Sequence, residues 1–391
     1  LMQKQITLRK GREMSIQRSH PWVFSGAIHA VSDNVTDGDV ISIVDYKNHF
    51  LAKAHYQKGS ISCRIISFQD IEIDLQFWIS KLEFAANYRK NILQIPNEHT
   101  NGYRLIHGEG DDLPGLIIDI YHDVGVIQSH SIGMLKSETA IAEALCQVMP
   151  GLKAVVGRSA IDSADKDLPA SKVLFGTLPH QIIFQENGFQ FSVDVLKGQK
   201  TGFFLDQRDN RQLLKELSAG RSVLNCFCYT GGFSIYAAGG GAREVKSVDI
   251  SSSAIDGLLI NTNLNGKLPH NTLVANVMEF LKTEDDLYDM VILDPPAFAK
   301  SIQKRHNAVQ AYKRLNLLGI RRVKKGGLLM TYSCSQVVDR ILFNNTITSA
   351  LIESGRSGKI IKELSQAPDH PVNIFHPEGH YLKGLLIYIE D

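Results

Sequence analysis

The spacing of hydrophobic residues is strand-like in the first part of the chain. Short apolar runs at 39–44 and 62–66 are separated by turn-forming sequences such as 36–39. Runs of this length, bounded by Gly, Asp and Thr, are typical of β-strands joined by tight turns. The pattern predicts a small β-rich domain over residues 1–73, with a barrel as one arrangement.

A mixed pattern follows from residue 74. Residues 75–95 place apolar side chains at helical spacing, and residues 139–148 read as a second helix. Between them, 116–121 and 124–127 read as the two strands of a hairpin. Helical periodicity beside a hairpin predicts a central α+β domain over 74–178.

The remainder of the chain divides at about residue 206. Strand-like sequences at 181–184 and 189–193 predict a β-hairpin linker over 179–205. From 206 to 391 apolar runs alternate with helical segments. These runs are 222–227, 245–250, 272–277, 290–293 and 328–332. Such alternation predicts an α/β domain, with a parallel sheet covered by helices on both faces.

The composition fits a chain with several globular domains. It has 391 residues, of which 43% are hydrophobic and 21% charged, and no apolar run of 18 residues. We therefore expect two or three domains, no membrane span and, from the charged N-terminus, no signal peptide, which favours a cytoplasmic protein. The five cysteines are odd in number and lack the spacing of a zinc site. Neither a disulfide framework nor a bound metal is predicted.

Basic residues cluster in two zones although the formal net charge is only +1. Residues 1–30 hold five Lys or Arg against Glu13 alone, and residues 295–338 hold nine without any Asp or Glu. The nine are Lys300, Lys304, Arg305, Lys313, Arg314, Arg321, Arg322, Lys324 and Lys325. Two basic zones in a near-neutral protein indicate a polyanionic partner. Solvated helix faces with acidic neighbours explain them equally well.

A glycine turn follows the first strand of the α/β domain. Strand 223–227 runs into 228–233, which holds two glycines, and a helix follows. Glycines let the backbone pass closely under a ligand at the carboxyl edge of a sheet. The next strand ends at Asp249, whose carboxylate can accept hydrogen bonds from ribose hydroxyls. Asn276, after the third strand, is expected to hydrogen-bond an adenine amino group.

Missing motifs narrow the choice of cofactor. The chain has neither G-x-G-x-x-G nor G-x-x-x-x-G-K-[ST], so a dinucleotide or a nucleoside triphosphate fits poorly. S-adenosylmethionine, which has a ribose and no phosphate, fits better. An ordinary α/β loop is the alternative. The residues expected to border the cofactor are Asn225, Phe227, Tyr229, Thr230, Gly231, Asp249, Asn276 and Asp294.

Two later strands end in residues that can carry chemistry. Residues 290–293 run into Asp294, which two prolines follow, and residues 328–332 lead to Cys334. A thiolate that attacks carbon 6 of a pyrimidine makes carbon 5 nucleophilic enough to take a methyl group. A carboxylic acid beside ring nitrogen 3 can supply or stabilise the proton that cytosine needs there. Cys334 and Asp294 suit these two roles, and basic residues of the second zone can favour the thiolate.

Each of these residues also has a purely structural interpretation. Asp294 can be a loop residue in a prolyl turn, and a lone cysteine is most often a small buried side chain. Cys226 and Cys228 compete with Cys334 for the thiol role, but both stand in the cofactor turn, where strand alternation buries at least one. Phe298 can cover a flipped base or fill a core.

The order of these motifs resembles that of the bacterial ribosomal RNA large subunit methyltransferase I family, which methylates carbon 5 of a cytosine in 23S rRNA. The similarity covers nearly the whole chain. Its motifs include K-G-R-E at 10–13, H-P-W-V-F-S-G-A at 20–27, Y-R-L-I at 103–106, L-D-Q-R-D at 205–209, Y-T-G-G-F at 229–233, D-P-P at 294–296, S-C-S at 333–335, D-H-P-V at 369–372 and Y-L-K-G at 381–384. Single motifs are weak, but this order is specific.

The resemblance implies a PUA domain, a central α+β domain and a seven-stranded, Rossmann-like class I methyltransferase domain. It also implies Cys334 as the nucleophile, Gln207 near the cofactor, S-adenosylmethionine as cofactor and 23S rRNA as partner. PUA-like domains bind structured RNA through its shape and backbone, so Lys10, Arg12 and Arg18 are candidate phosphate contacts. A homodimer is considered, although the sequence does not decide the oligomeric state.

Two positions depart from the pattern of the family, which often has an acidic residue at position 276 and Ser at position 228. Asn276 can still bond adenine, and the difference at Cys228 supports a non-catalytic role for that thiol. Three other functions stay open: methylation of another RNA base, methylation of an exocyclic amine held by the D-P-P turn, and a non-catalytic RNA-binding assembly factor. The intact Asp249, Asp294 and Cys334 argue against the last.

Overall fold

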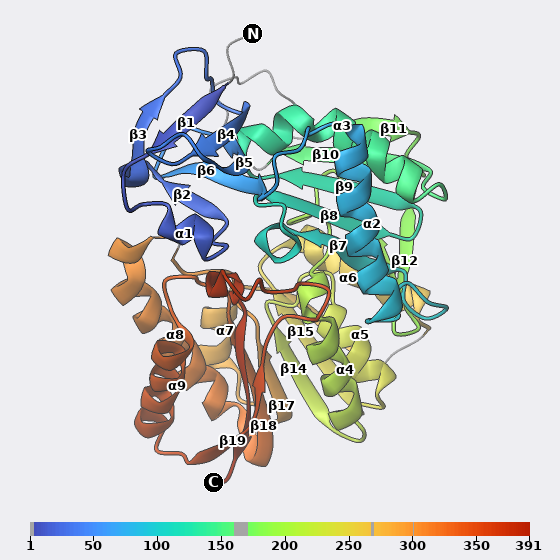
Figure 1. Cartoon of the computed structure of the whole chain (residues 1–391). Coiled ribbons are helices and arrows are strands. Elements are labelled where there is room, and N and C mark those ends of the chain that lie inside the picture. Colours follow the sequence, from blue (N-terminus) through green and yellow to red (C-terminus); the bar gives the residue numbers. More distant parts are fainter. Residues whose placement is uncertain (1–3, 160–170, 267–269, 300) are drawn as a thin grey trace. The chain divides into compact units, whose positions relative to one another are not determined.

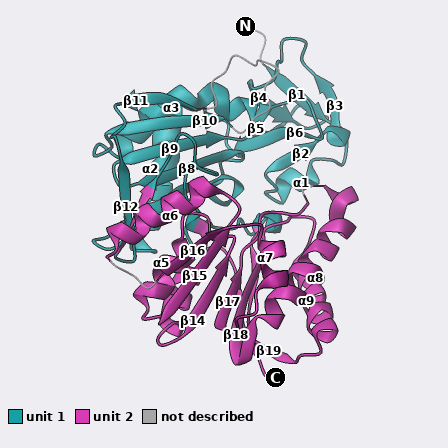
Figure 2. Ribbon diagram, turned by 180° about the vertical axis from the view of Figure 1, so that it is seen from behind, with its two compact units in different colours: residues 1–188, 193–205, 368–379 teal, residues 189–192, 206–367, 380–391 magenta. Residues whose placement is uncertain are grey.

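The structure, a computed structural model, describes residues 4–159, 171–266, 270–299 and 301–391. Lys300 of the second basic zone lies outside these ranges. The chain forms two compact units (Figure 2). Unit 1 comprises residues 1–188, 193–205 and 368–379, and unit 2 comprises residues 189–192, 206–367 and 380–391.

Unit 1 begins with a six-stranded sheet of order β2-β6-β5-β4-β1-β3 (Figure 1). The elements are β1 (Gln5–Leu8), α1 (Met14–Gln17), β2 (Trp22–Phe24), β3 (Ile28–Val31), β4 (Val40–Val44), β5 (Phe50–Tyr56) and β6 (Ile61–Ser67). Ile6, Ile43 and Ala54 are fully buried in its core. The strands predicted at 39–44 and 62–66 are confirmed as β4 and β6.

A five-stranded sheet of order β11-β10-β9-β8-β7 follows in unit 1. Its elements are α2 (Leu75–Asn91), β7 (Gly102–His107), β8 (Leu116–Tyr121), β9 (Val124–Ser129), α3 (Ile132–Val148), β10 (Ala154–Ser159) and β11 (Ser171–Gly176). The predicted hairpin is β8 and β9. Helix α3 begins earlier than residue 139 because Ser131 caps it by accepting from the Met134 N–H. The separation of unit 1 into two domains stays a prediction.

A late segment, 368–379, belongs to unit 1 although the sequence assigns 206–391 to one domain. Arg89 of α2, which is fully buried, donates to the Asp369 carbonyl at 2.8 Å and binds Asp111 with both of its terminal nitrogens. The Arg104 N–H donates to the Asp369 carboxylate at 2.9 Å. A buried guanidinium needs such partners, so these bonds hold the segment within unit 1.

The predicted linker hairpin is present as β12 (Ile182–Glu186) and β13 (Phe189–Val193), which form a two-stranded sheet. Unit 2 then holds a seven-stranded sheet of order β16-β15-β14-β17-β18-β20-β19. Its strands are β14 (Ser222–Cys226), β15 (Glu244–Asp249), β16 (His270–Val274), β17 (Tyr288–Leu293), β18 (Val323–Ser333), β19 (Gly358–Leu364) and β20 (Lys383–Ile389). The first five are mutually parallel, as predicted, but β20 runs antiparallel to both β18 and β19.

Helices cover both faces of this sheet (Figure 1). They are α4 (Arg208–Leu217), α5 (Gly232–Gly239), α6 (Ser252–Leu264), α7 (Val277–Thr283), α8 (Arg305–Arg321) and α9 (Arg340–Ser354). Along β17, Met290 and Ile292 pack with α4 and α5, whereas Val291 and Leu293 pack with α7, α8 and α9. This alternation along a buried strand explains why its apolar run is continuous. None of the helices in the described ranges has the length and apolarity to cross a membrane.

The strand order reverses at β14, which lies between β15 and β17. Ligands of open α/β sheets bind at such a switch point, beyond the carboxyl ends of the strands. A ligand site is therefore expected at the loops after β14, β15, β17 and β18.

Candidate cofactor and catalytic site

The loop after β14 has an unusual backbone. Phe227, Tyr229 and Gly231 have φ values of 59°, 48° and 84°, in the left-handed region that non-glycine residues avoid. Two bonds to β15 hold this conformation: Tyr229 N–H donates to the Asp249 carboxylate at 2.8 Å, and Cys228 N–H donates to the Val248 carbonyl at 3.1 Å. These two hydrogen bonds therefore tie the loop after β14 to the carboxyl end of β15.

The glycine of this turn is required by contact as well as by conformation. A Cβ atom on Gly231 would lie 2.6 Å from Cγ of Leu258 in α6. Such a separation is well inside van der Waals contact, so the loop or the helix would have to move. The close approach that the structure shows is to helix α6, and the predicted close approach to a ligand stays a prediction.

Two buried polar atoms border the same turn and have no partner among the described residues. They are Oδ1 of Asn225 and Oγ1 of Thr230. The Asn225 amide group itself is fixed, because its Nδ2 donates to Ser234 Oγ at 2.8 Å. Buried polar atoms are normally paired, so these two suit the polar groups of a bound ligand. The turn accordingly offers these two oxygens to a bound ligand, and their contact with S-adenosylmethionine stays a prediction.

Asp249 ends β15, and Asn276 lies two residues after β16. The side-chain oxygens of both already accept hydrogen bonds from backbone N–H groups. The two Asp249 oxygens each accept one backbone N–H, from Tyr229 and from Ser251. A carboxylate has about four acceptor positions, so ribose hydroxyls can still bind. Asn276 uses Oδ1 to cap α7, accepting from the N–H groups of Met278 and Glu279. Its NH₂ group, rather than the oxygen, is therefore the part available to adenine. That group can donate to a ring nitrogen but cannot bond the adenine amino group, and an adenine contact stays a prediction.

Asp294 directly follows β17 and is half-buried. Gln207, which is buried just before α4, donates from Nε2 to the Asp294 carboxylate at 3.1 Å. Asn210 in turn donates to Gln207 Oε1 at 2.6 Å, which fixes the orientation of the glutamine amide. Burial and the charge of Asp294 hold the pKa of Tyr332 well above its usual range. Asp294 is thus oriented by neighbours rather than left in a mobile loop.

Cys334 stands in a tightly bonded turn after β18. Leu293 of β17 is in register with Thr331, so β18 extends two residues further before Cys334, roughly 7 Å along the strand direction. Ser335 N–H donates to Ser333 Oγ at 3.3 Å, and Ser335 Oγ is 2.9 Å from the Tyr312 hydroxyl. Both serines are fully buried, whereas Cys334 is half-buried. The S-C-S pattern therefore holds a half-buried cysteine between two buried serines.

The other thiols of unit 2 do not suit catalysis. Cys226 is fully buried and Cys228 is 5% exposed. Burial raises the pKa of both thiols far above the usual range, which suppresses the thiolate. Phe298 packs its ring 4.6 Å from that of Tyr312 and lies against the core beneath α8. The core interpretation of Phe298 is the one that these contacts favour.

Comparison with known proteins places this geometry in a family. A family model for S-adenosylmethionine-dependent methyltransferases matches residues 104–374, and one for PUA-like domains matches residues 6–68. Ribosomal RNA large subunit methyltransferase I of Aeromonas hydrophila is 39% identical over 99% of both chains, and that of Vibrio vulnificus is 38% identical over 98% of both. The chain belongs to the ribosomal RNA large subunit methyltransferase I family.

Solved structures agree with the fold of this family. A methyltransferase candidate complexed with SAH superposes with a TM-score of 0.85, at 24% identity, over 99% of this chain and 100% of that one. A candidate S-adenosylmethionine-dependent methyltransferase from Streptococcus mutans gives 0.84, at 24% identity, over 98% and 100%. The predicted family, its PUA-like and methyltransferase parts, and S-adenosylmethionine as the cofactor are confirmed.

In this member of the methyltransferase I family, two cations of the second basic zone are paired with acidic residues away from the catalytic loops. Lys313 pairs with Glu353 at 2.6 Å, and Lys324 pairs with Asp289 at 3.1 Å near the amino end of β18. The cation whose pKa is influenced by Cys334 is instead Lys383, the first residue of β20. Lys383 belongs to the Y-L-K-G motif, and its sequence position alone indicates no role for it.

Candidate RNA contacts of the PUA-like part lie on its surface. Lys10, Arg12 and Arg18 are all exposed. The Lys10 ammonium lies 5.6 Å from the centre of the Tyr46 ring, which is itself 43% exposed. Exposure leaves these three cations available to phosphate groups, and their contact with RNA stays a prediction.

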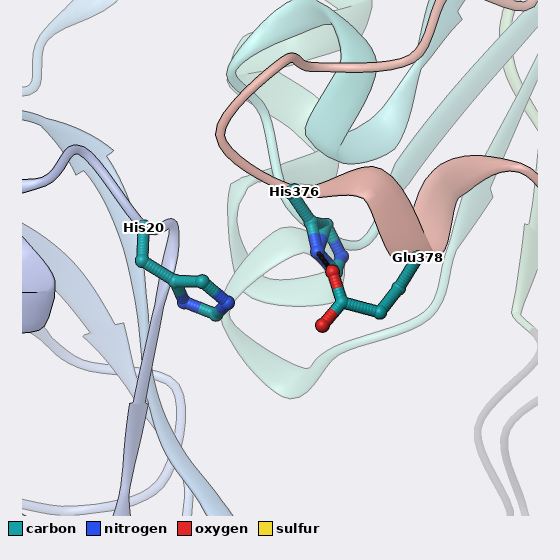
Figure 3. Close-up of side chains that lie close together, drawn as sticks. All are labelled: His20, His376 and Glu378. Atoms are coloured by element: carbon teal, nitrogen blue, oxygen red, sulfur yellow. Dashed lines mark hydrogen bonds and ion pairs between the residues drawn. The ribbon is translucent and has the colours of Figure 1, made fainter.

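One histidine cluster of unit 1 was not anticipated from sequence. Side-chain ligand atoms of His20, His376 and Glu378 lie within 4.8 Å of one another (Figure 3). His376 Nδ1 is 2.7 Å from the Glu378 carboxylate, and the Trp22 N–H donates to His20 Nδ1 at 3.1 Å. The His376 ring also packs 4.3 Å from that of Trp22. These internal partners explain the cluster as packing around a tryptophan.

Proposed function

We propose that this chain forms 5-methylcytosine in 23S ribosomal RNA, in the cytoplasm, through a covalent intermediate on Cys334. The observation that carries the proposal is the juxtaposition of strand ends. Asp294 and Cys334 follow the neighbouring parallel strands β17 and β18, and the glycine turn follows β14 on the other side of β17. Parallel neighbours end at one edge of a sheet, so methyl donor, acid and thiol share that edge.

Different residues of the chain bind different parts of the cofactor. Bound S-adenosylmethionine supplies an electrophilic methyl group. Asp249 receives the ribose hydroxyls, Asn225 and Thr230 offer their unpartnered oxygens to polar groups of the ligand, and Asn276 reaches the adenine. The strained backbone at Phe227 brings peptide groups close to the ligand.

Cys334 activates the base. Its thiolate attacks carbon 6 of the cytosine, an S–C6 bond forms, and the electron pair of the ring double bond moves toward nitrogen 3 to leave an enamine. Carbon 5 then attacks the methyl group of the donor, so that a C5–CH₃ bond forms while the sulfonium S–CH₃ bond breaks and S-adenosylhomocysteine leaves. A base removes the proton from carbon 5, the double bond re-forms, and the S–C6 bond breaks to return the thiolate.

Asp294 handles the charge that this attack creates. Electron density flows to nitrogen 3 when sulfur bonds to carbon 6, so a carboxylic acid there supplies or stabilises a proton. Gln207, by donating to the Asp294 carboxylate, restricts the rotation of that group. An amine methyltransferase would use Asp294 to hold an exocyclic amine and would need no thiol.

The RNA substrate is inferred from the family name and from charge. The curated relatives are named ribosomal RNA large subunit methyltransferases, and the PUA-like segment carries the exposed Lys10, Arg12 and Arg18. Cations on such a surface bind phosphates by releasing counterions. A target base must then leave its stack to reach the loop edge.

The test is methyl transfer to RNA with a matched pair of cysteine variants. Purified protein is incubated with tritiated S-adenosylmethionine and RNA from intact or partly assembled large subunits, and 5-methylcytosine is mapped by bisulfite sequencing. Cys334→Ala is expected to abolish a single 23S rRNA methylation that Cys146→Ala, at another half-buried thiol, retains. Methylation that persists in Cys334→Ala would point to an amine target. No methylation of any RNA by the wild type would favour the non-catalytic assembly factor.

A further inference from the structure

Lys383 is a buried lysine held against the turn that carries Cys334. It is 5% exposed and pairs across the antiparallel ladder with Ser333. Its Nζ donates to the carbonyl oxygens of Ser335 and Tyr381, both at 2.8 Å. An ammonium group has three donors, so one N–H remains beyond these two bonds.

Among the described residues, the hydrogen bonds of the Lys383 ammonium go to two carbonyl oxygens rather than to a carboxylate. Carbonyl oxygens neutralise a cation only partly, and a buried charge without a counterion is unfavourable. Burial lowers the pKa of Lys383 to about 8, and the negative charge of Cys334 acts in the opposite direction. A negative charge on Cys334 would therefore stabilise the buried Lys383 cation.

Other charged groups near Lys383 are already engaged. Asp339 caps α9 by accepting from the Leu342 N–H at 2.8 Å, and Arg340 faces Glu363 at 3.5 Å. The Tyr312 hydroxyl bonds to Ser335 Oγ, and burial raises the pKa of this tyrosine, which keeps it neutral. Among the groups that influence its pKa, Cys334 contributes the largest favourable interaction with the lysine cation.

We propose that Lys383 is a positioning residue that stabilises the thiolate of Cys334 and fixes the turn that presents it. The thiol loses its proton to solvent before attack, and the protonated form of Lys383 supplies the positive charge beside it. A cation beside a thiol favours the thiolate, which is the reactive form. The inference rests on the proposed function, because it gives this thiolate its use as nucleophile.

The experiment follows the alkylation of Cys334 by iodoacetamide as a function of pH, with peptide mass spectrometry to separate the cysteines. Only the thiolate reacts, so the midpoint of the rate profile reports thiolate formation. Cys146, whose pKa is raised by burial, is the internal reference in the same sample. In the wild type, Cys334 is expected to have a midpoint about one pH unit or more below that of Cys146.

Lys383→Met removes the charge and keeps the length of the side chain. It is expected to move the Cys334 midpoint up by about one unit, which slows alkylation near neutral pH about tenfold, and to leave the Cys146 profile unchanged. Lys383→Arg, which keeps the charge, is expected to recover at least part of the shift. A Cys334 midpoint that is unaltered in Lys383→Met overturns the proposal.

The wild-type protein and the independence of the two assays keep the experiment decisive. If Lys383→Met does not fold, judged by its circular dichroism melt, the wild-type comparison decides: a Cys334 midpoint at or above that of Cys146 overturns the proposal. Alkylation needs no RNA and no methyl transfer, so it is independent of the Cys334→Ala methylation test. If Cys334→Ala abolishes methylation but Lys383→Met leaves the alkylation profile of Cys334 unchanged, only the role of Lys383 is refuted. If Cys334→Ala keeps methylation while Lys383→Met shifts the alkylation profile, the proposed function is refuted instead.

Discussion

Gln207 donates its side-chain amide to the carboxylate of Asp294 at 3.1 Å, while Asn210 holds the other end of that amide. The chain of three side chains links the start of α4 to the end of β17. Rotation of a half-buried carboxylate is thereby restricted before any substrate arrives. Such orientation is what a group positioned beside a reacting ring requires.

Replacing Gln207 by Leu removes the donor to Asp294. We expect kcat for methyl transfer to fall about tenfold, or roughly 1.4 kcal/mol in activation free energy, because Asp294 loses its fixed orientation. Single-turnover tritium transfer measures the effect. Gln212→Leu, on the same helix with its amide bonded only to Glu216 at the surface, is the control and should match the wild type. Equal rates for the two variants would contradict the role given to this bond.

Gly231→Ala tests the glycine turn. The added Cβ meets Leu258, and φ is unfavourable, so we expect at least tenfold weaker binding of S-adenosylmethionine in calorimetry. Gly188→Ala is a matched control, because Gly188 has the same φ of 84° with nothing within 4 Å of the added carbon. The difference between the two variants isolates the contact with α6 from backbone strain. Normal binding by Gly231→Ala would rule out a close fit at this turn.

His55 of β5 should make stability depend on pH. It is 1% exposed, neither ring nitrogen has a partner among the described residues, and burial lowers its pKa from 6.5 to about 4. Between these values the unfolded chain takes up a proton and the folded chain does not, so stability falls as pH falls. At pH 5 the loss is about 2 kcal/mol.

Urea unfolding at pH 7.5 and pH 5 measures this dependence. In His55→Phe the loss on acidification should be smaller than in the wild type by about that 2 kcal/mol, since no imidazole remains to be protonated. His29→Phe, at an exposed histidine of β3, should keep the wild-type difference. An acid response of His55→Phe identical to that of the wild type would show that His55 does not stay neutral in the fold.

Arg12→Ala should weaken RNA binding in a salt-dependent manner. Removing one cation that binds a phosphate reduces the slope of log K against log salt by about 1, which filter binding over a salt series can resolve. Lys58→Ala removes another exposed cation, in the turn between β5 and β6, and should leave the slope unchanged. If the two variants had the same slope, Arg12 would contribute only to the net charge of the protein and would not bind a phosphate.

Much of the α/β domain could be predicted because buried parallel strands have a strong linear signature. The runs at 222–227 and 290–293 correspond to β14 and β17, and polar residues after each mark the functional edge. Strands β19 and β20 were missed. Most of β19 is exposed and lacks an apolar run, and β20 follows a long connection from 365 to 382.

Side-chain detail was harder to predict for a different reason. Nothing in the linear pattern relates Lys383 to Cys334, because only the pairing of β20 with β18 brings residue 383 opposite residue 333. Bonding of an adenine amino group calls for the side-chain oxygen of Asn276, but that oxygen caps α7, and capping depends on where β16 ends. Strand register and helix boundaries are decided by tertiary packing, which a single sequence reveals only in part.

The final strand also has a consequence for how the protein is made. β20 follows β19 in the sequence, yet it lies between β18 and β19 rather than at an edge. A nascent chain that has emerged only as far as β19 holds six strands of this sheet with the open edge of β18 unpaired, which is a template for aggregation. A premature stop codon shortly before residue 383 would produce almost the entire polypeptide and still leave that edge exposed. The segment 383–389 therefore decides between a completed sheet and a substrate for chaperones and proteases.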